Sequence, residues 1–226
     1  MLCTEEIVRA NIRNREGHRV YFLREGDRLT PGARDFLTRE RIRILPASEA
    51  PIEEYQLLSG GILKAKPEQM THLHGNVLVY KTHPRIGFRG AMDTLEAELL
   101  WCQTLAFPKE LGEILDLARH LIRCEVLNEP VKWERLCGMT EGELRKRSHH
   151  PEEFYGQPHF MPAHTDGQQV LALNRVRCAV RAAELAAAHA FIDADGNCTR
   201  IDILQALNRM SSTVYLLMIQ AKQEGK

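Results

Sequence analysis

The last quarter of the chain carries a regular apolar repeat, the feature that most limits how this chain can fold. The repeat consists of Ile203, Leu207, Met210, Val214, Leu217 and Ala221, at alternating steps of four and three residues. Such steps line up along one side of a helix, and the heptad-like spacing is typical of a seam that faces other helices in a bundle. We therefore predict a long helix from just after Asn197 to about Gln223.

The middle of the chain predicts the helices that this seam would meet. From about residue 91, apolar residues recur at three- and four-residue steps, and Pro108 opens a second helix of the same kind. Thr140 and Glu143 form a capping-box pattern, which predicts a shorter helix there. A long helix is predicted over residues 166–192. The architecture is therefore mainly α, a helical bundle.

The first 46 residues have a different pattern and predict a small strand–helix–strand unit. Residues 19–23 and 42–45 are short runs of β-branched, aromatic and aliphatic residues, which indicate strands. Between them, Thr30 and Pro31 form the start signal of a helix that runs to about Glu40. The predicted domains are thus this unit at 1–46, a Pro- and Gly-containing linker at 47–70, and the bundle domain at 71–226.

Composition excludes several classes of function. Thirty Lys and Arg balance thirty Asp and Glu, so a general nucleic-acid binder, which is usually basic, is disfavoured. No apolar run is long enough to span a bilayer, and the acidic start does not suit a signal peptide, so we expect a cytoplasmic protein. The six cysteines are scattered singly without a CxxC pair, which indicates reduced thiols and gives no support for a cysteine-based zinc site.

Polar residues mark one face of the long helix at 166–192. Asn174, Arg177, Arg181 and Glu184 are spaced three, four and three residues apart, which places them on the same face. They could form an ordinary solvated face with an Arg–Glu pair. Two arginines on one face could instead bind an anion, because guanidinium binds phosphate in a bidentate manner and stays charged.

The predicted last helix carries a second polar stripe along its length. The stripe consists of Asp202, Gln205, Asn208, Arg209 and Ser212, with Tyr215 after it. Asn and Ser disfavour helix interiors, so contacts with a ligand, or hydrogen bonds to a neighbouring helix, could explain them. A basic segment at residues 80–90 precedes the first bundle helix. Its cations and glycines suit a triphosphate at a helix entrance, although many basic loops are simply solvated.

Together these segments resemble a known family. The basic loop leads into Phe88-Arg89-Gly90-Ala91-Met92-Asp93, and the helices carry Arg181-Ala182-Ala183-Glu184 and Leu207-Asn208-Arg209-Met210-Ser211-Ser212. This arrangement is similar to the ATP:corrinoid adenosyltransferases that form helical bundles, and the stretch 203–215 is closest to their ethanolamine-utilisation branch. The resemblance covers nearly the whole chain.

The resemblance implies roles for individual residues in ATP binding. Lys81 and Arg85 match the loop positions that hold the ATP phosphates. Arg181 and Glu184 match the Arg and Glu of the nucleotide site, and Asn208 matches an asparagine that contacts ATP. Lys81 and Arg181 are, on this basis, expected to assist the reaction itself.

Two further matches concern the corrinoid and the assembly. Phe160 resembles a loop phenylalanine that packs under the corrin ring, which makes it the third residue expected to take part in catalysis. Asp93 matches an acid that pairs, across a subunit contact, with the arginine matched by Arg177. The resemblance thus implies a homo-oligomer, with a trimer favoured.

The implied reaction transfers the 5′-deoxyadenosyl group of ATP to the cobalt of cob(I)alamin, with Mg²⁺ supplied with ATP and triphosphate released. Suggested partners are ethanolamine ammonia-lyase or a cobalamin reductase, and a bacterial microcompartment is a suggested location. Some relatives bind a metal through a CCxxC motif, but the linker here has no cysteine, so no metal site is expected; whether His72 and His74 bind a metal stays open.

Other functions are compatible with the same residues. A carrier or sensor that binds corrinoid and ATP without reacting them would use the same pocket. A His-rich metal-dependent phosphohydrolase would need HxxxH or HD spacings, which His72, His74, His149 and His150 do not supply. A purely structural bundle protein would not need polar stripes on its helices.

Overall fold

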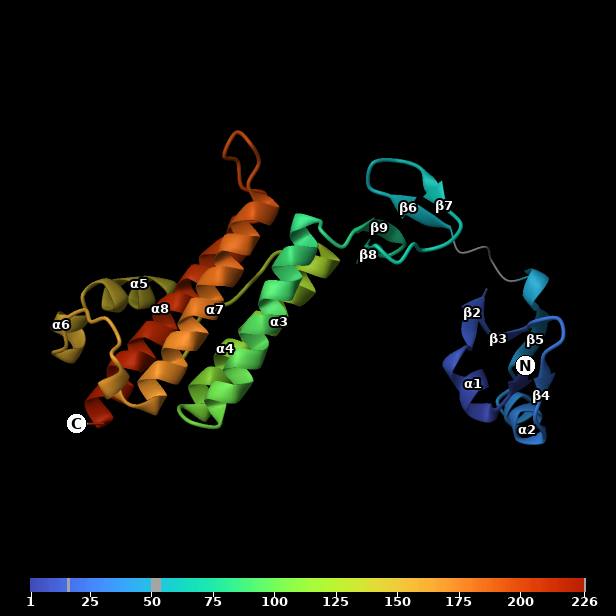
Figure 1. The fold of residues 1–226 in the computed structure, drawn as a ribbon, viewed down its shortest axis with the longest axis horizontal. Helices are drawn as coiled ribbons and strands as arrows, with labels where there is room; N and C mark the ends of the chain where they lie inside the picture. Colours follow the sequence, from blue (N-terminus) through green and yellow to red (C-terminus); the bar gives the residue numbers. More distant parts are fainter. Residues whose placement is uncertain (16, 50–53, 226) are drawn as a thin grey trace. The chain divides into compact units, whose positions relative to one another are not determined.

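The computed structural model describes residues 1–15, 17–49 and 54–225. The chain forms two compact units, Met1–Glu54 and Tyr55–Lys226, which are described separately. Figure 1 labels the elements of both units.

The first unit contains the predicted strand–helix–strand arrangement. Its elements are β1 (Leu2–Cys3), α1 (Glu5–Ala10), β2 (Arg13–Arg15), β3 (His18–Leu23), β4 (Arg28–Leu29), α2 (Pro31–Arg39) and β5 (Arg43–Pro46). Strands β3 and β5 pair in parallel, and α2 connects them. The Thr30 side chain accepts a hydrogen bond from the Ala33 N–H, which confirms the predicted cap. Phe36 and Leu37 of α2 are buried in this unit's own small core.

The second unit begins with a four-stranded sheet. It consists of β6 (Tyr55–Leu57), β7 (Ile62–Leu63), β8 (Met70–His74) and β9 (Val77–Tyr80), in the order β7-β6-β9-β8. Strands β6 and β7 lie within the range 47–70 that the sequence predicts as linker. Strands of two or three residues are too short to show an alternating pattern, so only the pairing of β6 with β9 and of β7 with β6 reveals them.

The helical bundle follows the sheet. Its elements are α3 (Pro84–Gln103), α4 (Pro108–Leu127), α5 (Glu141–His149), α6 (Pro151–Tyr155), α7 (Gln168–Phe191) and α8 (Ile201–Glu224). Helix α7 packs along both α3 and α8, and α4 packs on α3 (Figure 1). The predicted seam of α8 is buried from Ile203 to Ala221. Among the described residues, no helix has the length and apolarity required to cross a membrane.

Helix α3 begins earlier than the sequence pattern predicts. The basic segment 80–90 was expected to be a loop, but the helix starts at Pro84, with His83 as its N-cap. Proline suits the first helical position because its missing N–H has no partner there in any case. Phe88 and Met92 are buried in the bundle core, and this packing offsets the low helix propensity of Gly87 and Gly90.

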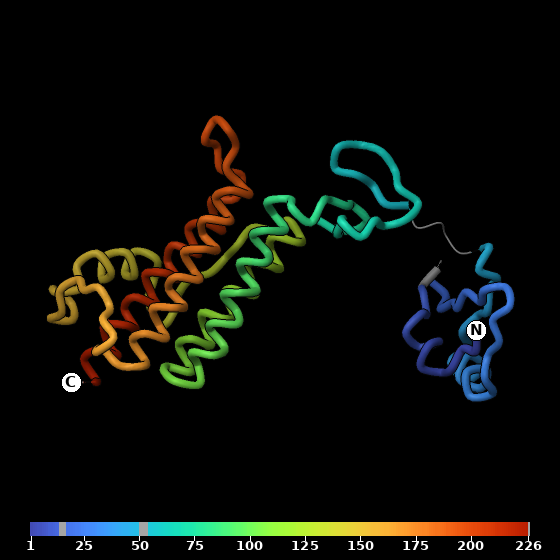
Figure 2. The backbone as a smooth tube through the Cα atoms, viewed as in Figure 1, coloured from blue at the N-terminus to red at the C-terminus, as the bar shows by residue number. Residues whose placement is uncertain are grey.

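The ends of the helices carry specific caps and loops. Thr140 and Glu143 form the predicted capping box at the start of α5. The loop between α7 and α8 projects beyond the ends of both helices (Figure 2). Within it, Asp193 accepts hydrogen bonds from the backbone N–H groups of Asp195 and Asn197, which hold the turn together.

Candidate functional site

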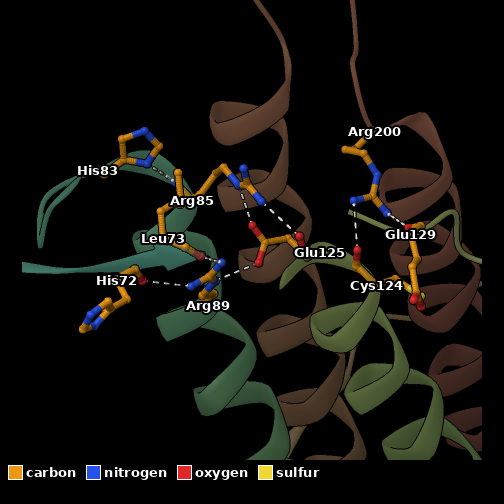
Figure 3. Close-up of polar contacts among 9 residues, drawn as sticks. All are labelled: His72, Leu73, His83, Arg85, Arg89, Cys124, Glu125, Glu129 and Arg200. Atoms are coloured by element: carbon orange, nitrogen blue, oxygen red, sulfur yellow. Dashed lines mark hydrogen bonds and ion pairs between the residues drawn. The ribbon is translucent and has the colours of Figure 1, made fainter. Parts of the chain in front are cut away.

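A buried carboxylate shared by two arginines lies where α3 begins (Figure 3). Glu125, in the last turn of α4, is fully buried. Its Oε1 accepts a hydrogen bond from Arg85 Nε at 2.5 Å, and its Oε2 accepts one from Arg89 Nε at 2.7 Å. One negative charge therefore faces two positive charges, and the cluster keeps a net positive charge.

The same cluster connects the bundle to the sheet. Arg89 donates through Nη2 to the carbonyl oxygen of Leu73 at 2.7 Å and through Nη1 to that of His72 at 3.4 Å. Both carbonyls belong to β8, so one guanidinium contacts the sheet, while its Nε contacts α4. The segment between β9 and α3 is thereby held close to the bundle.

His83 caps α3 in its neutral form. Its Nδ1 accepts a hydrogen bond from the Arg85 N–H at 3.2 Å, which a protonated ring could not do. Burial and the positive charges of Arg85 and Arg89 lower the pKa of His83 below its usual value. The ring is therefore uncharged at neutral pH and adds no cation to the cluster.

Arg200 and Asp202 stabilise the end of α4. Arg200 donates to the carbonyl oxygen of Cys124, in the last turn of α4, and to that of Glu129, just beyond the helix (Figure 3). Asp202 accepts from Arg200 and from the Val131 N–H at 2.8 Å. Burial raises the pKa of Asp202, but these hydrogen bonds outweigh it and the pKa is lowered overall. This part of the predicted polar stripe has a structural role.

Lys81 lies in the turn between β9 and α3, close to Arg85 in the sequence. Its ammonium group pairs with Glu68 at 3.1 Å, and the Glu68 side chain is 98% exposed. The hydrogen bond and the charge of Lys81 lower the pKa of Glu68. Because such an exposed pair contributes little stability, Lys81 can readily exchange this carboxylate for an anionic ligand.

The predicted nucleotide residues of the two long helices lie together in a second cluster. Asn208 Nδ2 donates to Glu184 Oε1 at 3.0 Å, which links α8 to α7. Arg181 is exposed and, among the described residues, makes no recorded hydrogen bond or ion pair. An open cavity of about 540 Å³ lies beside them, with Arg181, Glu184, Leu185 and Leu204 in its lining. The cluster therefore combines an unpaired cation, a carboxylate and an amide at one surface.

Arg209, which was not predicted as a site residue, is buried next to this cluster and contacts Asn208. It is 9% exposed, and its Nη2 donates to Asn208 Oδ1 at 2.7 Å. Its Nε and Nη1 are buried without a hydrogen-bond partner among the described residues, and Glu141 is 3.8 Å away. Because Arg209 donates to the oxygen of Asn208, the amide nitrogen of Asn208 must face Glu184.

Glu125 and Arg89 were also missed as site residues, although a signal for Glu125 was present. Position 125 continues the spacing of the buried Ala118 and Leu121 on α4, so a carboxylate occupies a core position. A charged residue at such a position is almost always paired. Arg89 carried no comparable signal, because its segment was interpreted as a loop.

A third cluster surrounds Phe160. The Phe160 N–H donates to the Tyr215 hydroxyl at 3.1 Å, and Lys222 lies 4.1 Å above the Phe160 ring centroid. A cavity of about 290 Å³ is lined here by Phe160, Met161, Tyr215 and Arg177, among other residues. The Met161 side chain is largely exposed. The cluster thus presents aromatic and apolar groups close to the solvent.

The predicted pair of Asp93 and Arg177 does not form within the chain. Asp93 is exposed and has no recorded hydrogen bond or ion pair among the residues that the structure describes. Arg177 donates to Asn174 Oδ1 at 3.1 Å, a neighbour on its own helix. The pairing across a subunit contact stays a prediction.

One chain does not bring the clusters together. Arg177 lines the cavity at Phe160, whereas Phe191 lies 6.0 Å from the guanidinium of Arg85. These two residues are 14 positions apart on α7, about 21 Å along the helix axis. The cluster of Lys81 and Arg85 and the cluster of Phe160 therefore lie far apart along α7, and Figure 1 shows the start of α3 and the segment that follows α6 towards opposite ends of the bundle.

Comparisons with known proteins agree with this architecture. The family model described as cobalamin adenosyltransferase matches residues 62–221. The chain is 34% identical to the corrinoid adenosyltransferase EutT of Salmonella typhimurium and 33% identical to that of Escherichia coli K12, each over 96% of this chain and 90% of the relative. No solved structure matches. The chain therefore belongs to the cobalamin adenosyltransferase family.

Proposed function

We propose that this protein transfers the 5′-deoxyadenosyl group of ATP to the cobalt of cob(I)alamin, giving adenosylcobalamin and triphosphate. The observation that carries the proposal is the cluster of Arg181, Glu184 and Asn208 beside an open cavity in a chain of this family. An unpaired guanidinium on a helix face is suited to phosphate, and the neighbouring amide and carboxylate can bind polar groups of a nucleotide.

The reaction is a displacement at the ribose 5′ carbon. The electron pair of Co(I) forms the cobalt–carbon bond, and the bond from C5′ to the phosphate oxygen breaks, with its electrons leaving on the triphosphate. No protein base is needed, because no proton is transferred. The protein aligns the reacting atoms, and Lys81, Arg85 and Arg181 stabilise the negative charge that grows on the leaving group.

The complete site forms, in our proposal, between subunits of a homo-oligomer, with a trimer favoured. The separation of the Lys81 and Phe160 clusters within one chain supports this. Asp93 supports it as well, because it is exposed and has no hydrogen bond or ion pair in the part of the chain that the structure describes. Phe160 would pack under the corrin ring near one chain's Arg177, and Lys81 and Arg85 of a neighbour would hold the triphosphate. Asp93 and Arg177 would pair across the contact.

Mg²⁺ is proposed to enter with ATP. In proteins this ion usually keeps several waters and binds through one or two carboxylates together with substrate phosphates. Glu184 is the carboxylate of the nucleotide cluster that could reach it. Further proposals are a cytoplasmic location, association with a bacterial microcompartment, and partnership with ethanolamine ammonia-lyase or a cobalamin reductase.

The decisive experiment mixes reduced cobalamin, Mg-ATP and the protein. We expect the absorption spectrum to change to that of the alkylated cofactor, with one triphosphate released per adenosylcobalamin. Bound ATP and bound corrinoid without either product would show instead a carrier or sensor. A test of Phe160→Ala alongside the wild type would report whether the apolar ring assists the corrinoid step.

A further inference from the structure

We infer that Glu125 is a positioning residue for triphosphate, acting through Arg85 and through the loop that carries Lys81. The inference rests on the proposed function, because it assigns phosphate binding to Arg85. It concerns a buried carboxylate that does not itself touch the substrate. Its effect would come from fixing the direction of two cations at the entrance of α3.

The first argument is the geometry of the Arg85 guanidinium. Arg85 Nε donates to Glu125 Oε1 at 2.5 Å, and Nη2 donates to the Glu125 backbone oxygen at 3.0 Å. Among the described residues, Nη1 of Arg85 has no hydrogen-bond partner, so it can bind a ligand. Because guanidinium is a rigid planar fork, holding one edge fixes the direction in which the remaining nitrogen points. The side chain stays 22% exposed, so an anion can approach it.

The second argument is charge. A carboxylate paired with one arginine would cancel its charge and weaken its attraction for phosphate. Glu125 is shared with Arg89, which binds Oε2 at 2.7 Å, so the three groups keep one positive charge in excess. His83, the other titratable group facing Arg85, is held neutral by burial and by the two arginines. Glu125 therefore holds Arg85 in place while the cluster keeps a net positive charge that attracts phosphate.

The third argument is the loop. Arg89 connects Glu125 to the carbonyls of His72 and Leu73 in β8, as Figure 3 shows. The Lys81 N–H donates to the carbonyl of Gln69, the residue just before β8. The position of the Lys81 backbone therefore depends on the position of that strand. Glu125 thus holds the loop of Lys81 through the sheet on one side and through the start of α3 on the other.

The test uses Glu125→Gln, which keeps the size of the side chain and removes its charge. Without the carboxylate, Arg85 and Arg89 repel each other and Arg85 loses its fixed direction. We expect the KM for ATP and the Kd for inorganic triphosphate, measured by calorimetry, to rise about tenfold. The KM for cob(I)alamin should not change. Glu125→Asp, which keeps the charge but not the reach, should give a smaller rise.

Glu96→Gln is the matched control. Glu96 of α3 also pairs with an arginine of α4, Arg119, but this pair is exposed. The control removes a carboxylate from the same helix pair and should leave the KM for ATP and the triphosphate Kd at the wild-type values. A change of similar size in both variants would reduce Glu125 to general support of the bundle and overturn the inference.

A double-mutant cycle separates positioning from a structural role. If Glu125 acts mainly through Arg85, Glu125→Gln should weaken triphosphate binding much less in an Arg85→Met background than in the wild type. The double variant also keeps the single excess positive charge of the wild type, which protects folding. Equal effects in both backgrounds, or unchanged triphosphate binding in Glu125→Gln, would overturn the inference.

Should Glu125→Gln not fold, Glu125→Asp decides: an unchanged triphosphate Kd in that variant would equally overturn the positioning role. A wild-type protein that binds triphosphate with this dependence but forms no adenosylcobalamin would refute the proposed function and leave the positioning role intact. If the wild type forms the product while Glu125→Gln keeps the wild-type KM for ATP, the proposed function stands and the positioning role of Glu125 is overturned.

Discussion

Asn208→Ala tests the row of hydrogen bonds from Arg209 through Asn208 to Glu184, which links α8 to α7. Asn208 accepts a hydrogen bond from the buried Arg209 at 2.7 Å and donates one to Glu184 at 3.0 Å. The truncation removes both bonds. It also leaves all three guanidinium nitrogens of Arg209 without a hydrogen-bond partner among the described residues, since Nε and Nη1 already have none.

The expected cost comes mainly from Arg209. A hydrogen bond to a charged group contributes about 1.5–3 kcal/mol, and water can replace part of it here because Asn208 itself is exposed. We therefore expect a loss of about 1.5 kcal/mol, which lowers the Tm by about 3–6 °C for a unit of this size. Loss of the ATP contact should reduce kcat/KM at least about tenfold, which corresponds to ~1.4 kcal/mol.

Asn208→Asp is the matched variant, because it keeps an acceptor for Arg209 but places a carboxylate against Glu184. We expect it to retain most of the thermal stability and still to lose activity. Calorimetry and steady-state kinetics with varied ATP measure the two effects. Wild-type stability and wild-type kcat/KM in Asn208→Ala would refute both the row of hydrogen bonds and the nucleotide contact.

Four further predictions can be checked separately. Arg181→Ala should reduce turnover at least about tenfold with folding intact, since the side chain is exposed and has no partner within residues 1–15, 17–49 and 54–225; unchanged kinetics would remove it from the site. The pKa of His83 in the folded protein lies below its usual value of 6.5, so the unfolded chain takes up a proton at this group first as the pH falls. The free energy of unfolding should therefore decrease between about pH 6.5 and the lower pKa of the folded state. His83→Asn keeps a capping side chain that does not titrate, and pH-dependent unfolding should show that this part of the loss disappears. Asp93→Ala should weaken assembly and activity in sedimentation and turnover assays; wild-type values in both would contradict the subunit pair. Elemental analysis of untagged protein should find no tightly bound iron or zinc, and one equivalent per chain that is lost with activity in His72→Ala or His74→Ala would disprove this.

Local signals in the sequence determined much of the fold. The seam of α8, the capping box at Thr140 and the start of α2 at Thr30 each depend on neighbours within a few residues, so they can be identified without the tertiary structure. The start of α3 was placed too late, because two glycines weaken the local helix signal and the burial of Phe88, which outweighs them, depends on distant helices.

The candidate site divides in the same way. Sequence spacing alone places Arg181 and Glu184 on one helix face, because 3.6 residues per turn governs both positions. The link from Asn208 to Glu184 joins two helices, and the partners of Arg85 come from α4, 40 residues further along the chain. The spacing on α4 already places Glu125 at a core position, but only the packing of α3 against α4 reveals that its partners are Arg85 and Arg89. Tertiary structure likewise decided that the Lys81 and Phe160 clusters lie at opposite ends of one bundle, since helix length sets their separation and sequence order does not.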